Sequence, residues 1–129
     1  PQTIPGFADA QAEVNDQTIA YSIGGDGPPV LLLHGFPEFG GAWVDFAPRL
    51  AQRYHVIAPD QRGYGQSYAP HDVAAYTAPQ LVADMAPLLR APAVVVGHDW
   101  GANVVWNLAL LHPERVNKII NLALPYQER

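Results

Sequence analysis

The pentapeptide Gly97-His98-Asp99-Trp100-Gly101 constrains this chain more than any other feature. It follows an apolar, β-branched run, Ala93–Val96, and precedes a run of helical character, Ala102–His112. This is the layout of a sharp strand–turn–helix junction, where glycines are needed because larger side chains would clash. The central side chain then projects from the carboxyl end of a sheet, and here it is the carboxylate of Asp99.

A carboxylate in such a turn is suited to act as a nucleophile. It attacks carbon, displaces a leaving group and forms an ester intermediate. This chemistry indicates epoxide opening or carbon–halogen cleavage rather than peptide or lipid hydrolysis. The alternative is that Asp99 only caps the following helix, since Asp is a favoured N-cap residue. The flanking glycines, together with two further loop motifs, favour the nucleophile.

Composition narrows the class of protein. The chain has 129 residues, 49% of them hydrophobic and 15% charged, as expected for one packed domain. With a net charge of −5 and no basic cluster, we expect neither nucleic acid nor a membrane as partner. No apolar stretch approaches the ~20 residues of a membrane helix. The absence of cysteine fits a reducing compartment, so a cytoplasmic location is expected.

Strand-like and helix-like segments alternate along the chain. After an irregular lead-in over 1–10, the predicted strands are Gln11–Val14, Thr18–Ile23, Val30–Leu33, Tyr54–Ala58, Ala93–Val96 and Asn117–Leu122, and the predicted helices are Ala42–Gln52, Thr77–Leu89 and Ala102–His112. Pro87 should end or kink the second helix early. Trp43, Trp106 and Tyr54 are expected in the core. The pattern predicts an α/β fold, with a mostly parallel sheet that begins with an antiparallel hairpin and carries helices on both faces.

Three loops should meet at the carboxyl ends of the parallel strands, where ligands bind in such sheets. They carry His34-Gly35-Phe36-Pro37-Glu38, then Asp60-Gln61-Arg62-Gly63-Tyr64-Gly65-Gln66-Ser67, and then the Asp99 pentapeptide followed by Ala102. Together with Val104–Arg115, these motifs resemble the α/β-hydrolase superfamily, and in particular the soluble epoxide hydrolases of bacteria. The likeness extends over 11–129, which we interpret as the N-terminal part of a hydrolase core domain.

The resemblance implies a role for each matching residue. Asp99 is the nucleophile, and the backbone N–H groups of Phe36 and Trp100 form the oxyanion hole. Trp100, Phe36, Pro37 and Tyr126 line the substrate pocket. Structural support for the loops is expected from His34, His98, Asp60 and Arg62. The two histidines are not interpreted as metal ligands, so neither a metal nor another cofactor is expected.

Two related activities fit the motifs less well. Haloalkane dehalogenases usually carry Asn where Phe36 stands, and Phe36 has no side-chain N–H for a halide. Fluoroacetate-type dehalogenases usually carry Arg where this chain has Trp100. Hydrolysis of an epoxide to a vicinal diol is therefore favoured, with a haloalkane-type dehalogenase as the alternative.

The resemblance also predicts groups that this chain does not contain. Turnover needs a triad acid, a His that activates water, and a Tyr proton donor on a cap. The only His after Asp99 is His112, about 11 helical residues and roughly 16 Å away. We therefore expect the N-terminal half of an enzyme, inactive alone, or a non-catalytic assembling fragment. The strand at Asn117–Leu122 should form an open edge that pairs with a complementary C-terminal chain or self-associates.

One internal segment departs from the family pattern. The link between Asp84 and the Ala93 strand is shorter than usual and contains Pro87 and Pro92. Since proline interrupts a helix, this departure leaves the length of the helix that begins near Thr77 open.

Overall fold

The chain forms an α/β structure, shown by a computed structural model. The structure describes residues 4–15, 17–34, 43–61, 67, 69, 78–89, 91–98 and 100–122, with the side chains of 78, 100, 102 and 103 excepted.

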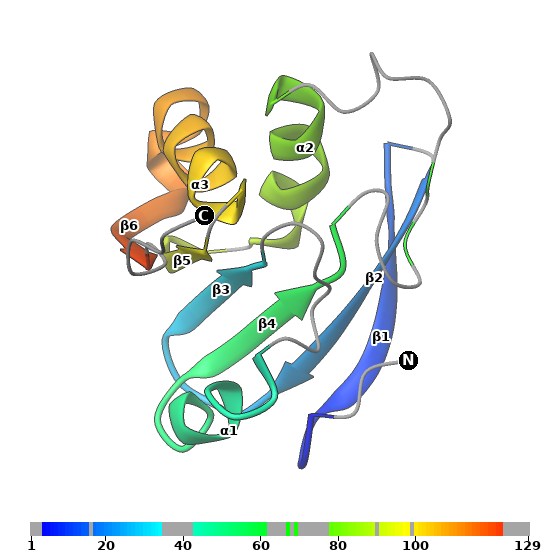
Figure 1. Ribbon diagram of the computed structural model, residues 1–129, viewed down its shortest axis with the longest axis vertical. Coiled ribbons are helices and arrows are strands. Elements are labelled where there is room, and N and C mark those ends of the chain that lie inside the picture. Colours follow the sequence, from blue (N-terminus) through cyan, green and yellow to red (C-terminus); the bar gives the residue numbers. More distant parts are fainter. Residues whose placement is uncertain are drawn as a thin grey trace, which may run out of the picture.

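A six-stranded sheet organises the molecule (Figure 1). Its strands are β1 (Ala8–Val14), β2 (Gln17–Gly24), β3 (Pro29–Leu33), β4 (His55–Pro59), β5 (Ala93–His98) and β6 (Val116–Leu122), in the order β1-β2-β4-β3-β5-β6. β1 pairs with β2 and β2 with β4 in antiparallel fashion, whereas β4, β3, β5 and β6 run parallel. The predicted fold class, a mostly parallel sheet that begins with an antiparallel hairpin, is confirmed.

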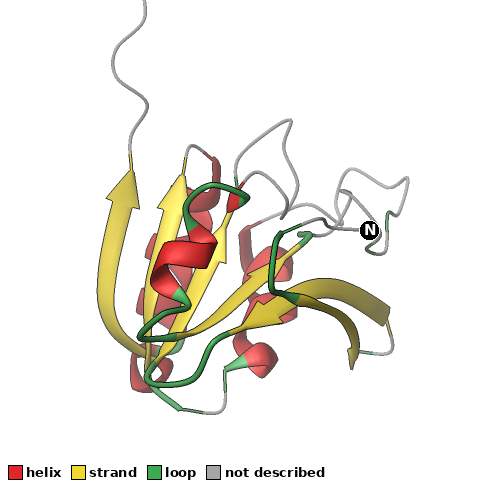
Figure 2. Cartoon of the chain, turned by 90° about the horizontal axis from the view of Figure 1, so that it is seen from below, coloured by secondary structure: helices red, strands yellow, loops and turns green. Residues whose placement is uncertain are grey.

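The helices lie on both faces of the sheet (Figure 2). They are α1 (Ala47–Leu50), α2 (Ala78–Met85) and α3 (Trp100–Leu111), with short 3-10 turns at Ala86–Leu88 (η3) and Pro113–Arg115 (η4). The early end of the second helix is confirmed, because α2 stops at Met85, two residues before Pro87.

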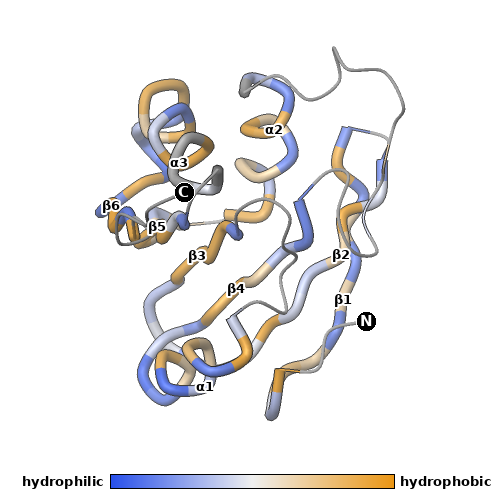
Figure 3. Tube along the Cα trace, viewed as in Figure 1, coloured by the Kyte–Doolittle hydropathy of each residue, from blue (hydrophilic) through white to orange (hydrophobic). Residues whose placement is uncertain are grey.

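The interior position of β3 in the sheet explains why its sequence is apolar at every position. Leu31 and Leu33 pack into a core with α2 and α3, whereas Val30 and Leu32 pack into a second core with α1. Successive side chains of a strand point to opposite faces, so a strand covered on both faces needs no polar alternation. Figure 3 shows β3 as apolar along its length. Each fully buried Leu contributes about 1.5–3 kcal/mol of transfer free energy.

Two elements begin three or more residues away from their predicted starts. β1 begins at Ala8 rather than Gln11, because backbone pairing with β2 continues past the alternating pattern, and Ser22 Oγ donates to Asp9 Oδ1 over 3.2 Å. The first helix covers only Ala47–Leu50 instead of 42–52. Pro48 lies in its first turn, which is where proline is accepted, and so the helix cannot extend far upstream of it.

β6 forms one edge of the sheet. Within the described residues it pairs only with β5, and Ile120 and Leu122 are 42% and 37% exposed. Nearby, α3 exposes further large side chains, including Trp106 at 56% and Leu110 at 76%. The expected core position of Trp106 is therefore wrong for this chain. None of the helices in the described ranges is long and apolar enough to span a membrane.

Candidate active site

The junction between β5 and α3 has the compactness that the glycine-flanked motif predicts. β5 ends at His98 and α3 begins at Trp100, so a single position, Asp99, separates strand from helix. Asp99 itself lies outside the described residues, and only the backbone of Trp100 lies within them. The nucleophilic role of Asp99 therefore stays a prediction, and the structure describes only the strand and the helix on either side of it.

Gly101 explains how α3 can start so close to the sheet. A Cβ at this position would overlap the carbonyl oxygen of Leu33 and lie 2.7 Å from that of His34. The first turn of α3 therefore rests directly on the end of β3, and only a residue without a side chain fits there. Leu33 is also the parallel partner of Gly97 on β5. The β5–α3 junction and the end of β3 thus lie together at the carboxyl ends of the parallel strands.

His34 and Gln61 join the loops that follow β3 and β4. The Gln61 backbone N–H donates to His34 Nε2 over 2.9 Å, and the Gln61 side-chain amide donates to the His34 carbonyl oxygen over 2.7 Å. Both residues are buried, at 1% and 5% exposure. Because Nε2 accepts a hydrogen bond, the neutral ring carries its proton on Nδ1. The two bonds hold the neighbouring loops in a fixed register at the candidate site.

A second set of hydrogen bonds, at Asp60 and Ser67, connects the residues after β4 to β2. Ser67 Oγ donates to the Asp60 carbonyl oxygen over 2.5 Å and accepts the Ala20 N–H over 2.8 Å. The Asp60 N–H in turn donates to the Ala20 carbonyl oxygen over 2.8 Å. Asp60 is fully buried and Ser67 is 8% exposed. The loop after β4 is thereby fixed to β2.

His98 ends β5 beside an aromatic wall. Its ring lies edge-on to Trp43, with centroids 6.3 Å apart, and Trp43 is 7% exposed within the core beside α1. The predicted core position of Trp43 is confirmed. Among the described residues, Trp43 Nε1 and Gln61 Oε1 are buried polar atoms without a hydrogen-bond partner.

The structure thus brings His34, Asp60 and His98 to the carboxyl ends of the parallel strands. Four other predicted residues, namely Phe36, Pro37, Arg62 and Tyr126, lie outside the described residues. Sequence reasoning missed Gln61 and Ser67 as bracing residues, although both belong to the second loop motif. Their polar side chains inside a glycine-rich run were the available signal. No group of three metal-ligating side chains gathers in the part of the chain that the structure describes.

His112 lies at the other end of α3 from the β5–α3 junction. It follows the last helical residue, Leu111, and its Nδ1 is 3.5 Å from Glu114 Oε2. The pKa of Glu114 is lowered, first by a hydrogen bond from its own backbone N–H and then by His112 and Arg115. This cluster is partly to largely exposed and belongs to the surface near η4.

Fold and junction together define the class of this protein. The family model of the alpha/beta hydrolase fold matches residues 28–127, and the chain belongs to this family.

Within the family, the chain resembles epoxide hydrolases. It is 50% identical to epoxide hydrolase A of Mycobacterium tuberculosis over 103 residues, which cover 76% of this chain and 32% of that protein. An epoxide hydrolase structure from Vigna radiata superposes with a TM-score of 0.89 at 36% identity, covering 98% of this chain and 43% of the other. Epoxide hydrolase A from Mycobacterium thermoresistibile gives 0.87 at 43% identity, with 92% and 40% covered. The chain therefore spans a third to under half of the length of these relatives and corresponds to their N-terminal part.

Proposed function

We propose that this chain supplies the nucleophile and the oxyanion hole of an epoxide hydrolase. The observation that carries the proposal is the one-residue junction at Asp99, seated on the end of β3 by Gly101. In such a junction the side chain of the intervening residue projects away from the sheet. The relatives named as epoxide hydrolases support the choice of substrate class.

The first step is attack by an Asp99 carboxylate oxygen on an epoxide carbon. The carbon–oxygen bond of the ring breaks, and the epoxide oxygen leaves as an alkoxide that takes a proton from a donor. The product is a hydroxyalkyl ester of Asp99. We propose that a residue beyond this chain provides this proton.

The second step is hydrolysis of that ester. Water adds to the Asp99 carbonyl carbon, and the resulting oxyanion accepts hydrogen bonds from the N–H groups of Phe36 and Trp100. Trp100 opens α3, so its N–H has no acceptor within the helix and is available for this task. Collapse of the tetrahedral anion releases the diol and restores the carboxylate. The base that activates water is not His112, which lies at the far end of α3.

Isotope labelling tests this route. The chain is combined with the corresponding C-terminal segment of the Mycobacterium tuberculosis relative and given substoichiometric styrene oxide in ¹⁸O-labelled water. Ester hydrolysis at the carbonyl carbon places the label in Asp99 and leaves the first-turnover diol unlabelled. Direct attack of water on the epoxide would label the diol instead and would refute the mechanism.

A matched pair of variants controls for the site. Asp99→Asn should form no adduct and no diol, whereas Asp45→Asn, at an exposed position near α1, should behave as wild type. Halide release from 1-chlorobutane without diol production from styrene oxide would favour the dehalogenase alternative.

We also propose that the chain alone does not turn over and that the β6 edge receives a complementary segment. The exposed apolar side chains of Ile120 and Leu122, with Trp106 on α3, support this. The mass of the purified chain in solution, with and without the C-terminal segment, tests it. Diol production by the isolated monomer would contradict the proposal.

A further inference from the structure

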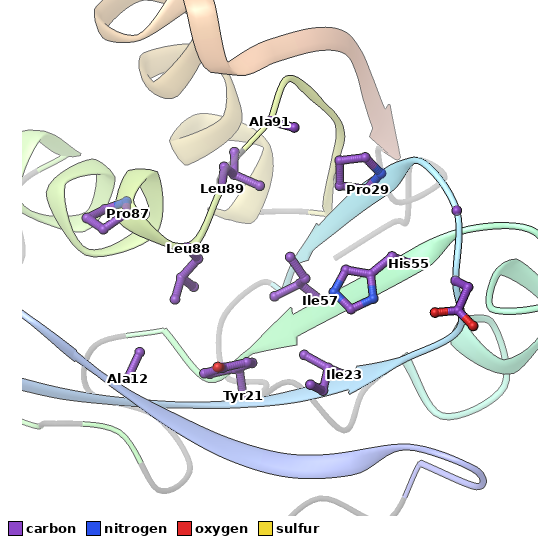
Figure 4. A pocket seen from close by; sticks show the side chains of 12 residues that line it. Ala12, Tyr21, Ile23, Pro29, His55, Ile57, Pro87, Leu88, Leu89 and Ala91 are labelled. Atoms are coloured by element: carbon purple, nitrogen blue, oxygen red, sulfur yellow. The ribbon is translucent and has the colours of Figure 1, made fainter.

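A pocket lies between η3 and the face of the sheet, and its lining reaches the amino ends of the parallel strands (Figure 4). Its lining includes Pro29 and His55, the first residues of β3 and β4, and Ala91, just before β5. These are the amino ends of strands whose carboxyl ends carry the candidate active site. The pocket has a volume of about 490 Å³, which is within the range of small-molecule sites.

The early end of α2 makes room for this pocket. The helix stops at Met85, and the chain continues through η3 into an extended Leu89, with φ −101° and ψ 116°. Leu88 and Leu89 form the wall there, above the sheet residues Tyr21 and Ile57 (Figure 4).

Arg115 fixes that wall in place. Its Nη1 donates to the carbonyl oxygens of Ala86 and Leu89 over 2.6 and 3.0 Å. The two acceptors are the first residue of η3 and the residue that follows it, so one guanidinium holds both ends of the turn. Hydrogen bonds from a charged donor are stronger than neutral ones, so the guanidinium stabilises the turn that forms this wall.

The other end of the pocket is a tightly packed glycine loop before β3. Gly25 and Gly27 adopt φ of +79° and +128°, which disfavour other residues, and a Cβ at either would overlap backbone oxygens of 51–54. The His55 N–H donates to the Pro28 carbonyl oxygen over 3.0 Å. Asp26, between the two glycines, is thereby held at the rim.

Two polar groups at this end of the pocket can accept hydrogen bonds from a ligand. His55 Nδ1 lies 3.0 Å from the Gly25 carbonyl oxygen, and a carbonyl can only accept, so Nδ1 carries the proton. In the neutral ring Nε2 is then an acceptor. The Asp26 carboxylate is also an acceptor. The remaining wall is mainly aliphatic and aromatic, with Ile23 beside Ile57 and Tyr21 (Figure 4).

We propose that this pocket binds an apolar small molecule that carries a hydrogen-bond-donating head group, with the head at His55 and the apolar body against Leu88 and Ile57. The site is separate from Asp99 and does not depend on the proposed hydrolase activity. It is a second ligand site, formed where α2 ends early.

Titration of the isotopically labelled chain with 1-naphthalenemethanol, followed by amide NMR, tests the proposal. Saturable shifts should appear at Gly27, His55, Leu88 and Leu89 and be absent at Leu110 on the exposed side of α3. The methyl ether of the same probe lacks the donor and should bind roughly 2- to 12-fold more weakly, the factor that one net hydrogen bond provides. Shifts spread over the whole chain, or none, would overturn the proposal.

Variants separate the pocket from the head-group assignment. Leu88→Trp fills the space and should abolish the saturable shifts, whereas Leu110→Trp, at a residue that is 76% exposed, should leave them unchanged. His55→Phe keeps a ring but removes the acceptor, so it should bind the alcohol and the ether equally. If His55→Phe retains the preference for the alcohol, the assignment of the head group to His55 is wrong. This comparison of the two probes does not depend on whether Leu88→Trp folds.

Discussion

Replacing Gly101 by Ala probes the packing that seats the β5–α3 junction on the sheet. In an isolated helix, Ala would be favoured over Gly by about 1 kcal/mol. Here the added Cβ meets the carbonyl oxygen of Leu33 in the central strand, which cannot rotate away as a side chain could. Overpacking of a rigid site costs about 1–3 kcal/mol, and backbone contact places this case at the upper end. We expect a net loss of about 2 kcal/mol in the free energy of unfolding.

Urea unfolding followed by circular dichroism measures this loss. With a slope near 1–3 kcal/mol/M, the midpoint of Gly101→Ala should fall by roughly 1 M. The matched control is Gly24→Ala, where the added Cβ lies 2.6 Å from the ring of Phe7. That ring is a half-buried side chain and can turn aside, so a loss below about 1 kcal/mol is expected. A Gly101→Ala midpoint at or above that of wild type would refute the argument that close backbone approach requires glycine.

Three further changes test the bracing of the site and one surface charge. Gln61→Leu removes the hydrogen bond from the Gln61 amide to the buried His34 carbonyl and should cost about 1–3 kcal/mol in urea unfolding; an unchanged midpoint would show that the bond contributes nothing. Ser67→Ala removes the acceptor of the Ala20 N–H, and a similar loss should be accompanied by faster hydrogen exchange at that amide but not at neighbouring amides of β2. The pKa of Glu114 is lowered in the folded chain, chiefly by its own backbone N–H. Its contribution to the free energy of unfolding is therefore complete above the pKa of the unfolded state and disappears as the pH falls through the pKa of the folded state. Glu114→Gln should therefore lower the midpoint slightly at neutral pH and not at all near pH 2; a difference that grows with acidity would contradict this sign.

The central strands and the position of the junction could be predicted because their causes are local. Val30–Leu33 must be apolar on both faces, and Gly97 and Gly101 leave few alternatives to a sharp turn. The extent of β1 was not predictable in the same way. Its first residues are held by pairing with Ile23 and Ser22 on β2, and they carry no apolar pattern of their own.

The bracing of the site depends on contacts between distant positions. Ser67 bonds to Ala20, and Gln61 bonds to His34, so neither role shows in the residues on either side. Trp106 was wrongly expected in the core because α3 is apolar over most of its length, so its sequence does not mark which face is covered. The covered face is decided by the neighbouring elements, and a single-sequence pattern does not contain them.

The strand order also determines when the candidate site can assemble. β3 does not pair with β2, which precedes it, but with β4 and β5, and Val30 meets Val94 far along the chain. During synthesis the apolar segment 30–33 therefore emerges long before its second partner strand exists. Pairings between distant residues form slowly and leave apolar surface exposed in the meantime. The same central position that places the end of β3 beside the β5–α3 junction leaves this apolar segment in need of protection from aggregation while the protein folds.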